Sequence, residues 1–411
     1  MSGPADVSTA SQTRKSIAIG EPSLWSLSLS FFRIGVTAFG GFMALISVVQ
    51  TEIVERRKLL THAEMLDGIS LATILPGPVA VNVVAYVGYK LRGGAGALVS
   101  AGSVILPGFI FMVTLSAVYF RWGQIPAASK LFLGFIPAVT AIIVHAAWGM
   151  ARKALLGLPE VIFAVVACLL LLLKGGFYIT LIIIVGAGVI GWLAFAGLAS
   201  VLSPKAPRDS ANPLAAKGKG TRLLSLGAPL AAAPLLALDA GLALKLFVTF
   251  AGMSVLLFGG GFVFIPLIQH IVVQEHPWLV QQEFVDAIAL TQMTPGPILN
   301  IAAFIGYKVM GLIGAAIATV GIFLPPALLM LVSAHFLART RNSPHVKAVL
   351  RGIRPAVVGM IAAAAWSIGS TAAPNWQSAV IFLAALTVLL RLRVNVVWII
   401  PSAGLAGLLL Y

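Results

Sequence analysis

The tripeptide Pro-Gly-Pro occurs twice in this chain, and both copies lie inside apolar sequence. The residues are Pro76, Gly77 and Pro78 in the first copy and Pro295, Gly296 and Pro297 in the second. A helix cannot pass undisturbed through this motif, because each proline lacks a backbone donor and clashes with the preceding turn. Inside a bilayer, the freed backbone groups must find partners in protein or at a polar cavity. The motif therefore predicts two interrupted helices.

The composition places these breaks in a membrane. The chain has 411 residues, of which 60% are apolar and only 9% are charged, whereas a soluble domain carries roughly a quarter charged residues. Several stretches reach the ~20 apolar residues that cross a bilayer. We expect an all-α polytopic membrane protein. The net charge of +15 fits basic cytoplasmic loops, so it does not indicate nucleic-acid binding, and the single Cys168 excludes an intrachain disulfide framework.

The sequence also repeats itself at a separation of 218 or 219 residues. Phe39-Gly40-Gly41 falls on Phe258-Gly259-Gly260, Pro107 on Pro325, Gly134 on Gly352 and Trp148 on Trp366. We therefore divide the chain into a polar N-terminal segment, two membrane repeats and a connection between them. The segments are 1–24, 25–201 (first repeat), 202–243 (basic linker and apolar connection) and 244–411 (second repeat). The apolar stretch 223–238 is interpreted as a surface segment rather than an extra span.

Loop charges suggest that the two repeats are inverted. Each half offers five apolar stretches plus the broken segment, and in the first half we expect spans near 25–51, 94–120, 130–151, 158–173 and 177–201. Each arm of the broken segment covers only about 18 Å, so the segment either dips in and returns or crosses as one broken helix. A returning segment gives an odd number of crossings per half, and this places most loop Lys and Arg on the cytoplasmic side. We expect ten spans, two re-entrant segments and both termini outside.

The breaks are the candidate binding site. The arms after each Pro-Gly-Pro begin with proline, a favoured first helical residue, and their first N–H groups lack intrahelical partners. Together with the helix dipole, these groups favour an anion. Asn82 and Asn300 lie in the first turn or so and offer side-chain donors. Gly40, Gly41, Gly259 and Gly260 permit close approach of the broken segments or act as a hinge, although close helix packing is the favoured interpretation of each cluster taken alone.

Five ionisable residues in or beside apolar sequence are candidates for proton coupling or charge pairing. Glu64 and Asp67 share one helix face, and Glu283 and Asp286 repeat this spacing. For the glutamates, capping of the first helical turn is an equally good interpretation. Arg33 has no cationic counterpart in the second half, and it either pairs with an anion or carboxylate or extends to the interface. No metal-ligand, nucleophile or cofactor motif is present in the sequence, so we expect neither an enzyme nor a cofactor.

These motifs together resemble the chromate ion transporter family in its long form with two homologous domains. The resemblance covers Phe39-Gly40-Gly41, Leu75–Asn82, Tyr86–Lys90, Phe258–Gly261, Thr294–Pro297 and Phe304–Tyr307. It implies export of chromate, linked to the proton motive force, across a bacterial cytoplasmic membrane, with sulfate as a related tetrahedral anion. The expected partners are the oxyanion, protons and the lipid bilayer; a homo-oligomer stays open. A passive anion channel and a non-transporting membrane subunit are the alternatives.

Overall fold

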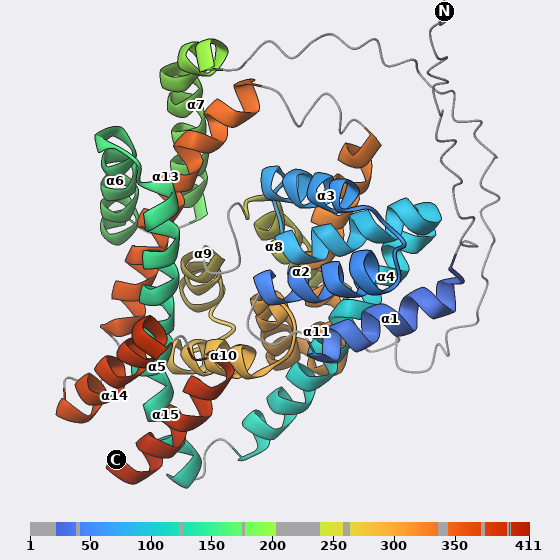
Figure 1. The fold of residues 1–411 in the computed structure, drawn as a ribbon. Helices are drawn as coiled ribbons and strands as arrows, with labels where there is room; N and C mark the ends of the chain where they lie inside the picture. The colour runs from blue at the N-terminus through green and yellow to red at the C-terminus, as the bar shows by residue number, and fades with distance from the viewer. Residues whose placement is uncertain are drawn as a thin grey trace, which may run out of the picture.

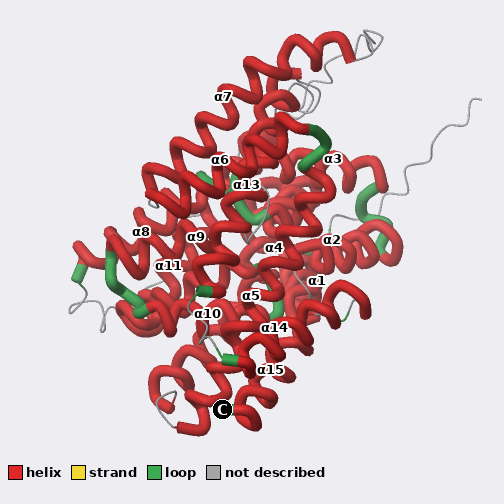
Figure 2. Tube along the Cα trace, turned by 90° about the vertical axis from the view of Figure 1, so that its left-hand side faces the viewer, coloured by secondary structure: helices red, strands yellow, loops and turns green. Residues whose placement is uncertain are grey.

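The computed structural model describes most of the chain, and every regular element in the described part is a helix (Figure 2). The described residues are 22–37, 42–122, 126–174, 177–202, 239–257, 264–335, 344–370, 375–392, 394 and 396–411. Within them, five helices are long and apolar enough to cross a membrane, and four shorter apolar helices accompany them. A polytopic helical protein is therefore confirmed, while the number of ten crossings stays a prediction.

The helices follow the same order in both halves. The first half contributes α1 (Leu24–Thr37), α2 (Phe42–Gln50), α3 (His62–Ile74), α4 (Val79–Trp122), α5 (Pro126–Ala154), α6 (Leu158–Lys174) and α7 (Phe177–Leu202). The second contributes α8 (Ala240–Val255), α9 (Phe264–Gln269), α10 (Gln281–Met293), α11 (Ile301–His335), α13 (Pro344–Gly369), α14 (Trp376–Thr387) and α15 (Val396–Leu410). The segment 25–51, expected as one span, holds two helices, α1 and α2, on either side of residues outside the described ranges.

Local irregularities recur at matching positions. Both α4 and α11 contain a sharp kink, at Arg92-Gly93 and at Met310-Gly311, where the two glycines have φ of 60° and 62°. Each kink folds the helix back on itself, because Gly88 packs on Gly96 in the first half and Gly306 on Gly314 in the second. Each α4-like helix is therefore a short arm followed by a long span. A π-helical turn also recurs, at Thr51–Arg56 and His270–Glu275.

The helices form two groups, and each group draws on both halves of the sequence (Figure 1). The core group contains α1–α4, α8 and α11, with α4 packed on α11. The flanking group contains α5–α7 and α13–α15. Within it α5 packs on α15, where Gly134 meets Ala403, and α13 packs on α7, where Gly352 meets Ala187. The sequence repeats therefore exchange helices, and neither repeat forms a separate structural unit. In Figure 1, α9 and α10 lie between the two groups.

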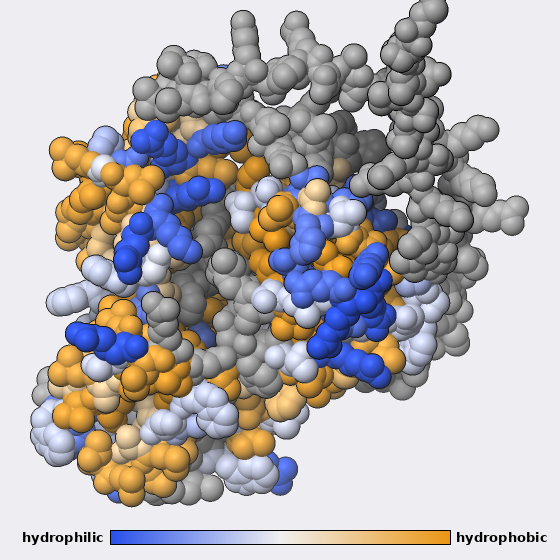
Figure 3. Space-filling view, viewed as in Figure 1, coloured by the Kyte–Doolittle hydropathy of each residue, from blue (hydrophilic) through white to orange (hydrophobic). Residues whose placement is uncertain are grey.

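The outer surface is what a lipid environment requires. Figure 3 shows large apolar areas, including the region of α6. Along α6, Ile162, Val165 and Leu169 are each about half exposed or more. A soluble protein rarely exposes contiguous apolar surface on this scale, whereas lipid chains cover it without cost.

Candidate functional site

The first Pro-Gly-Pro ends α3 and starts the short arm of α4. The chain leaves the helix at Leu75, whose φ and ψ of −79° and 150° are extended. Gly77 then takes φ of +107°, a conformation that residues with a Cβ rarely adopt. The side-chain amide of Asn82 donates to the carbonyl of Pro76 at 3.1 Å, so it braces the break from the inside of the turn.

The second Pro-Gly-Pro is built in the same way. Thr294 is extended, Gly296 has φ of +100°, and the Asn300 amide donates to the carbonyl of Pro295 at 3.4 Å. A single 3-10 turn, Ile298–Asn300, precedes α11. Two breaks 219 residues apart therefore share their backbone path and their internal hydrogen bond. This similarity indicates that the two breaks are equivalent elements of a repeated structure.

Asn82 and Asn300 do not serve only as donors to a ligand, as the sequence suggested. Each uses one amide hydrogen to hold its own break together, so only the second hydrogen is left for a ligand. Both residues are fully buried, and the Oδ1 atoms of Asn82 and Asn300 have no hydrogen-bond partner within the described residues. Their first role is to position the backbone N–H groups of the arm.

The two arms of the first break lie side by side. A Cβ on Gly68 would overlap the ring of Tyr86, and these residues lie nine positions before and nine positions after Gly77. Such a contact requires the chain to fold back at the break. A helix that continued in one direction would carry the two residues far apart.

Each break rests on a helix of the other half. The Gly77 N–H donates to the carbonyl of Leu257 at 2.7 Å, and a Cβ on Gly77 would overlap Pro326 of α11. In return, a Cβ on Gly108 of α4 would overlap Asn300 and the carbonyl of Pro295. Gly108 and Pro326 occupy equivalent repeat positions, 218 residues apart. The breaks are thus reciprocally locked, each against the long span of the other half.

The glycine pairs predicted to approach the breaks, Gly40-Gly41 and Gly259-Gly260, lie outside the described residues. Their neighbours are placed on either side: α1 ends at Thr37 and α2 begins at Phe42, and in the second half the described chain resumes at Phe264.

The two glutamates have structural partners. Glu64 accepts from the backbone N–H and the hydroxyl of Thr61, both at 2.9 Å, and so caps the start of α3. Glu283 accepts from the N–H of Val280 at 3.1 Å and forms an ion pair with Lys308 at 2.8 Å. Capping, one of the two interpretations left open by the sequence, accounts for both positions.

The two aspartates lie in very different surroundings. Asp67 is half-buried, whereas Asp286 is only 2% exposed. Asp286 accepts from the hydroxyl of Tyr119 at 2.7 Å and from the amide of Gln282 at 2.9 Å. Both donors are neutral, and among the described residues Asp286 forms no ion pair. Burial of a carboxylate without a counter-charge is costly, and binding of a proton removes that cost.

Tyr119 is a site residue that sequence reasoning missed. It lies in an apolar part of α4, 167 residues before Asp286, and its hydroxyl is its only polar atom. Its ring packs on Phe132 of α5 at 5.0 Å and on Phe304 of α11 at 5.3 Å between centroids. The spacing of Tyr119 and Asp286 in the sequence does not indicate that they are in contact.

Arg33 lies at a cleft whose lining includes no Pro-Gly-Pro residue. It is exposed, and it lines a polar cleft of about 500 Å³ with Ser30, Thr37, Glu52 and Arg56. Glu52 is already shared by Arg56 and Arg57 at 3.7 and 2.7 Å. The position of Arg33 at this cleft fits charge pairing at the surface better than direct contact with a ligand at the breaks.

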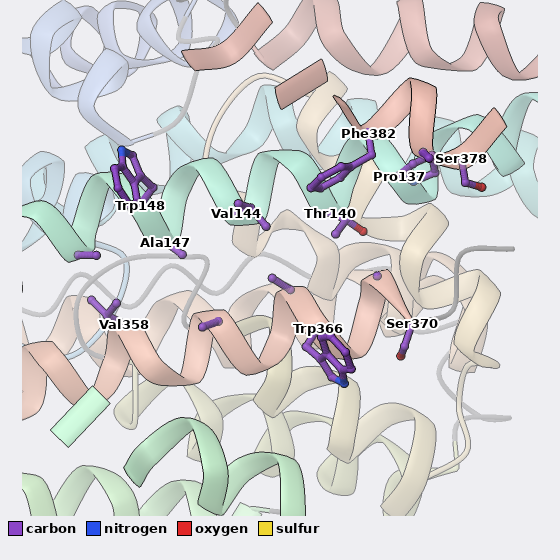
Figure 4. A pocket seen from close by; sticks show the side chains of 15 residues that line it. Pro137, Thr140, Val144, Ala147, Trp148, Val358, Trp366, Ser370, Ser378 and Phe382 are labelled. Carbon is purple, nitrogen blue, oxygen red and sulfur yellow. The ribbon is translucent and has the colours of Figure 1, made fainter. Parts of the chain in front are cut away.

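Two larger cavities occur, each of about 740 Å³. One lies between α5, α13 and α14 and is lined by apolar groups such as Trp148, Trp366 and Phe382 (Figure 4). The other separates Ile74 and Pro76 of the first break from α7 and α13. Only the second cavity touches a Pro-Gly-Pro motif. Within the described residues, no group of three His, Cys, Asp or Glu side chains is placed to hold a metal ion.

Comparison with known proteins identifies one family. The family described as chromate transporter matches residues 25–192 and 244–408. The chain is 28% identical over 390 residues to a chromate transport protein of Cupriavidus metallidurans, covering 95% of this chain and 94% of that protein. It is 30% identical over 390 residues to a chromate transport protein of Pseudomonas aeruginosa, covering 93% of this chain and 91% of that protein.

A third relative is about half as long. An uncharacterized transporter of Bacillus subtilis is 32% identical over 170 residues, which make up 96% of that protein but 40% of this chain. No solved structure matches this chain.

Proposed function

Since the chain belongs to the chromate transporter family, we propose that it is a secondary transporter that exports chromate across the bacterial cytoplasmic membrane and confers chromate resistance. We take the proton motive force as its energy source. The observation that carries this proposal is the pair of identically braced Pro-Gly-Pro breaks, each buried against the other half. Breaks of this kind are the usual binding elements of secondary transporters.

The chemistry of the site suits a tetrahedral dianion. The arms after the breaks start at Val79 and Ile298, and the first N–H groups of a helix have no partner within it. These groups and the helix dipole attract an oxyanion. The second amide hydrogens of Asn82 and Asn300 add two donors. No lysine or arginine is needed at the breaks, so the anion is held by neutral donors from which it can leave again.

We further propose that the halves are inverted repeats and that the broken segments are re-entrant. The directions of the packed helices support this. In α13, Gly352 meets Ala187 and Ala348 meets Gly191 of α7, so α13 and α7 are antiparallel. Arg351 pairs with Glu160 of α6 at 3.0 Å, and Gly359 meets Ala164, so α13 and α6 are parallel. Both directions agree with the loop-charge topology.

Asp286 is our candidate for the proton-coupling carboxyl. It lies two turns before the second break on α10 and is buried with only neutral donors. A proton arriving at Asp286 neutralises a buried charge near the site of a second negative charge, the anion. Coupling of this kind needs no direct contact between the proton and the anion, because each charge raises the electrostatic cost of the other.

The test is chromate binding to purified protein with a charge placed at a break. Asn300→Asp keeps the shape of the side chain, adds a negative charge and removes the amide that donates to the Pro295 carbonyl. At a separation of about 6 Å and an effective dielectric constant near 20, two unit charges repel by about 3 kcal/mol. We expect chromate affinity to fall by at least about tenfold. Asn375→Asp, at the start of α14, is the matched control, with affinity unchanged. A folded Asn300→Asp protein with the affinity of the original would exclude the break as the anion site.

A further inference from the structure

We propose that the two halves of the molecule are captured in opposite conformations. The cavity beside Pro76 is then the open, cytoplasm-facing access path to the site, and the packed surroundings of Asp286 are the closed outer gate. This inference rests on the proposed transport function. It adds which elements move and which side chain closes the gate.

Equivalent residues of the two halves differ in burial. Leu66 of α3 is 59% exposed, whereas its repeat equivalent Val285 of α10 is 0% exposed. Asp67 is half-buried, and its equivalent Asp286 is 2% exposed. The sequences of these helices are matched at one spacing, so a symmetric molecule would bury both to the same extent. The difference therefore lies in how the helices are packed.

The difference in burial extends along the whole of α3 and α10. In α10, eight consecutive residues from Phe284 to Thr291 are buried, so the helix is covered on every side. In α3, the buried residues are Met65, Gly68, Leu71 and Ala72, which form a single face. The uncovered face of α3 carries the hydroxyl of Thr73 beside Leu66.

The partners of α3 and α10 explain the difference. Helix α10 packs directly on α5 and α15 of the flanking group. The repeat equivalents of α5 and α15 are α13 and α7, and these face the first break across the cavity of about 740 Å³. Ile74 and Pro76 form one wall, and residues such as Gly188 and Ile353 form the other. The core and flanking groups therefore touch at one broken segment and stand apart at the other.

The closed end is held by Tyr119. Its hydroxyl donates to Asp286 of α10 at 2.7 Å, and its ring packs edge-on against Phe132 of α5 at 5.0 Å. One side chain of α4 thus connects α10 to the flanking group. Nearby, Lys308 pairs with Glu283 at 2.8 Å. The contact of the Tyr119 ring with Phe132, together with the packing of α10 on α5 and α15, is the gate that has to separate before the anion can leave on the outer side.

The open end faces the cytoplasm according to the loop charges. Helix α3 follows the basic segment Arg56-Arg57-Lys58, and the α13 wall of the cavity begins at His345, close to Lys347 and Arg351. At its rim, the Trp192 indole donates to His345 at 2.9 Å. Positive charges of this density mark cytoplasmic loops.

An exchange of the two conformations yields the opposite state. Helix α3 then packs against α7 and α13 as α10 now packs on α15 and α5, while α10 separates from the flanking group. The site between the breaks is opened to one side at a time, because closure of one cavity and opening of the other are the same motion. The two states differ in their gates, because the repeat equivalents of Tyr119 and Gln282 are Leu337 and Ala63, which carry no side-chain donor.

Cysteine labelling tests this exchange. In a Cys168→Ala background, Leu66→Cys and Val285→Cys are labelled with a membrane-impermeant maleimide in right-side-out and inside-out vesicles. We expect rapid labelling of Leu66→Cys from the cytoplasmic side only, and slow labelling of Val285→Cys from either side. Addition of Tyr119→Phe removes the hydrogen bond that positions the Tyr119 ring between Asp286 of α10 and Phe132 of α5. Val285→Cys labelling from outside then rises by about tenfold and Leu66→Cys labelling falls, as expected when one hydrogen bond to a charged group is lost.

Tyr411→Phe is the matched control, because the Tyr411 hydroxyl bonds Ser378 at 2.6 Å within the flanking group, away from the gate. It should leave both labelling rates unchanged. The inference is overturned if Leu66→Cys is not labelled from the cytoplasm, or if Tyr119→Phe shifts both rates in the same direction or neither. Chromate flux measured in the same vesicles separates the two proposals. Flux without reciprocal labelling refutes only the exchange, and reciprocal labelling without chromate flux refutes only the substrate.

Discussion

Alanine at the central glycine of each break separates backbone strain from steric overlap. Gly77 and Gly296 have φ of +107° and +100°, so alanine is strained at both positions, by about 1–3 kcal/mol. Their surroundings differ. A Cβ on Gly77 overlaps Pro326, whereas the nearest atom to a Cβ on Gly296 is the Asn300 amide nitrogen at an ordinary 3.4 Å. Overlap in a packed core adds about 1–3 kcal/mol.

We therefore expect Gly77→Ala to destabilise the protein by about 2–6 kcal/mol and Gly296→Ala by about 1–3 kcal/mol. The assay is thermal unfolding of the purified protein in detergent, with initial rates of chromate flux measured in parallel. Gly102→Ala in α4 is the control, because φ is helical there and nothing lies within 4 Å of an added Cβ. Alanine at that position should be neutral or slightly stabilising, since it favours the helix.

The reasoning fails if Gly77→Ala and Gly296→Ala lower the midpoint equally, because the Pro326 contact would then contribute nothing. It fails as well if Gly102→Ala is as harmful as either. A further reading comes from Pro326→Ala, which removes the atoms that the new methyl group meets. This change should recover part of the stability of Gly77→Ala and none of the stability of Gly296→Ala.

Three further predictions concern charged groups. Arg351→Ala leaves Glu160, whose side chain is 3% exposed, without its cation. We expect the free energy of unfolding to fall by about 1–3 kcal/mol, a range that allows for the exposed guanidinium. Addition of Glu160→Gln should restore part of this stability. Lys308→Ala breaks a partly exposed ion pair and should cost less than about 1 kcal/mol. A larger loss in the same assay would refute this expectation. Asp286→Asn should keep chromate binding but abolish the acceleration of chromate flux by an imposed pH gradient. The control Asp239→Asn, at the start of α8, should keep that acceleration. Continued acceleration in Asp286→Asn would exclude Asp286 as the coupling group.

The features that sequence reasoning found are those set by local chemistry. Proline and glycine fix the breaks at Gly77 and Gly296 whatever surrounds them, and the capping role of Glu64 follows from Thr61 three residues earlier. The polytopic helical class follows from composition, because apolar stretches of this length are typical of membrane-spanning helices. Family membership rested on the combination of these local motifs.

The features that sequence reasoning missed depend on packing between distant segments. The segment 25–51 is largely apolar, so hydropathy predicted one span, whereas the structure describes two helices in it, α1 and α2, with residues 38–41 outside the described residues. The bond between Tyr119 and Asp286 joins residues 167 positions apart. The unequal burial of Leu66 and Val285 depends on which distant helices cover α3 and α10, whereas two matched sequences predict equal burial. A repeat in the sequence therefore reveals matching elements but not how unequally they are packed.

Steady-state chromate accumulation by the purified protein in proteoliposomes, with the pH gradient as the only driving force, tests the proposed transport most directly. We predict saturable accumulation of chromate above its equilibrium level. We also predict competition by sulfate, and loss of accumulation when the pH gradient is collapsed. Chromate flux that never exceeds the imposed chromate gradient would contradict a proton-driven carrier and indicate a passive channel, and the absence of any flux from folded protein would indicate a non-transporting subunit.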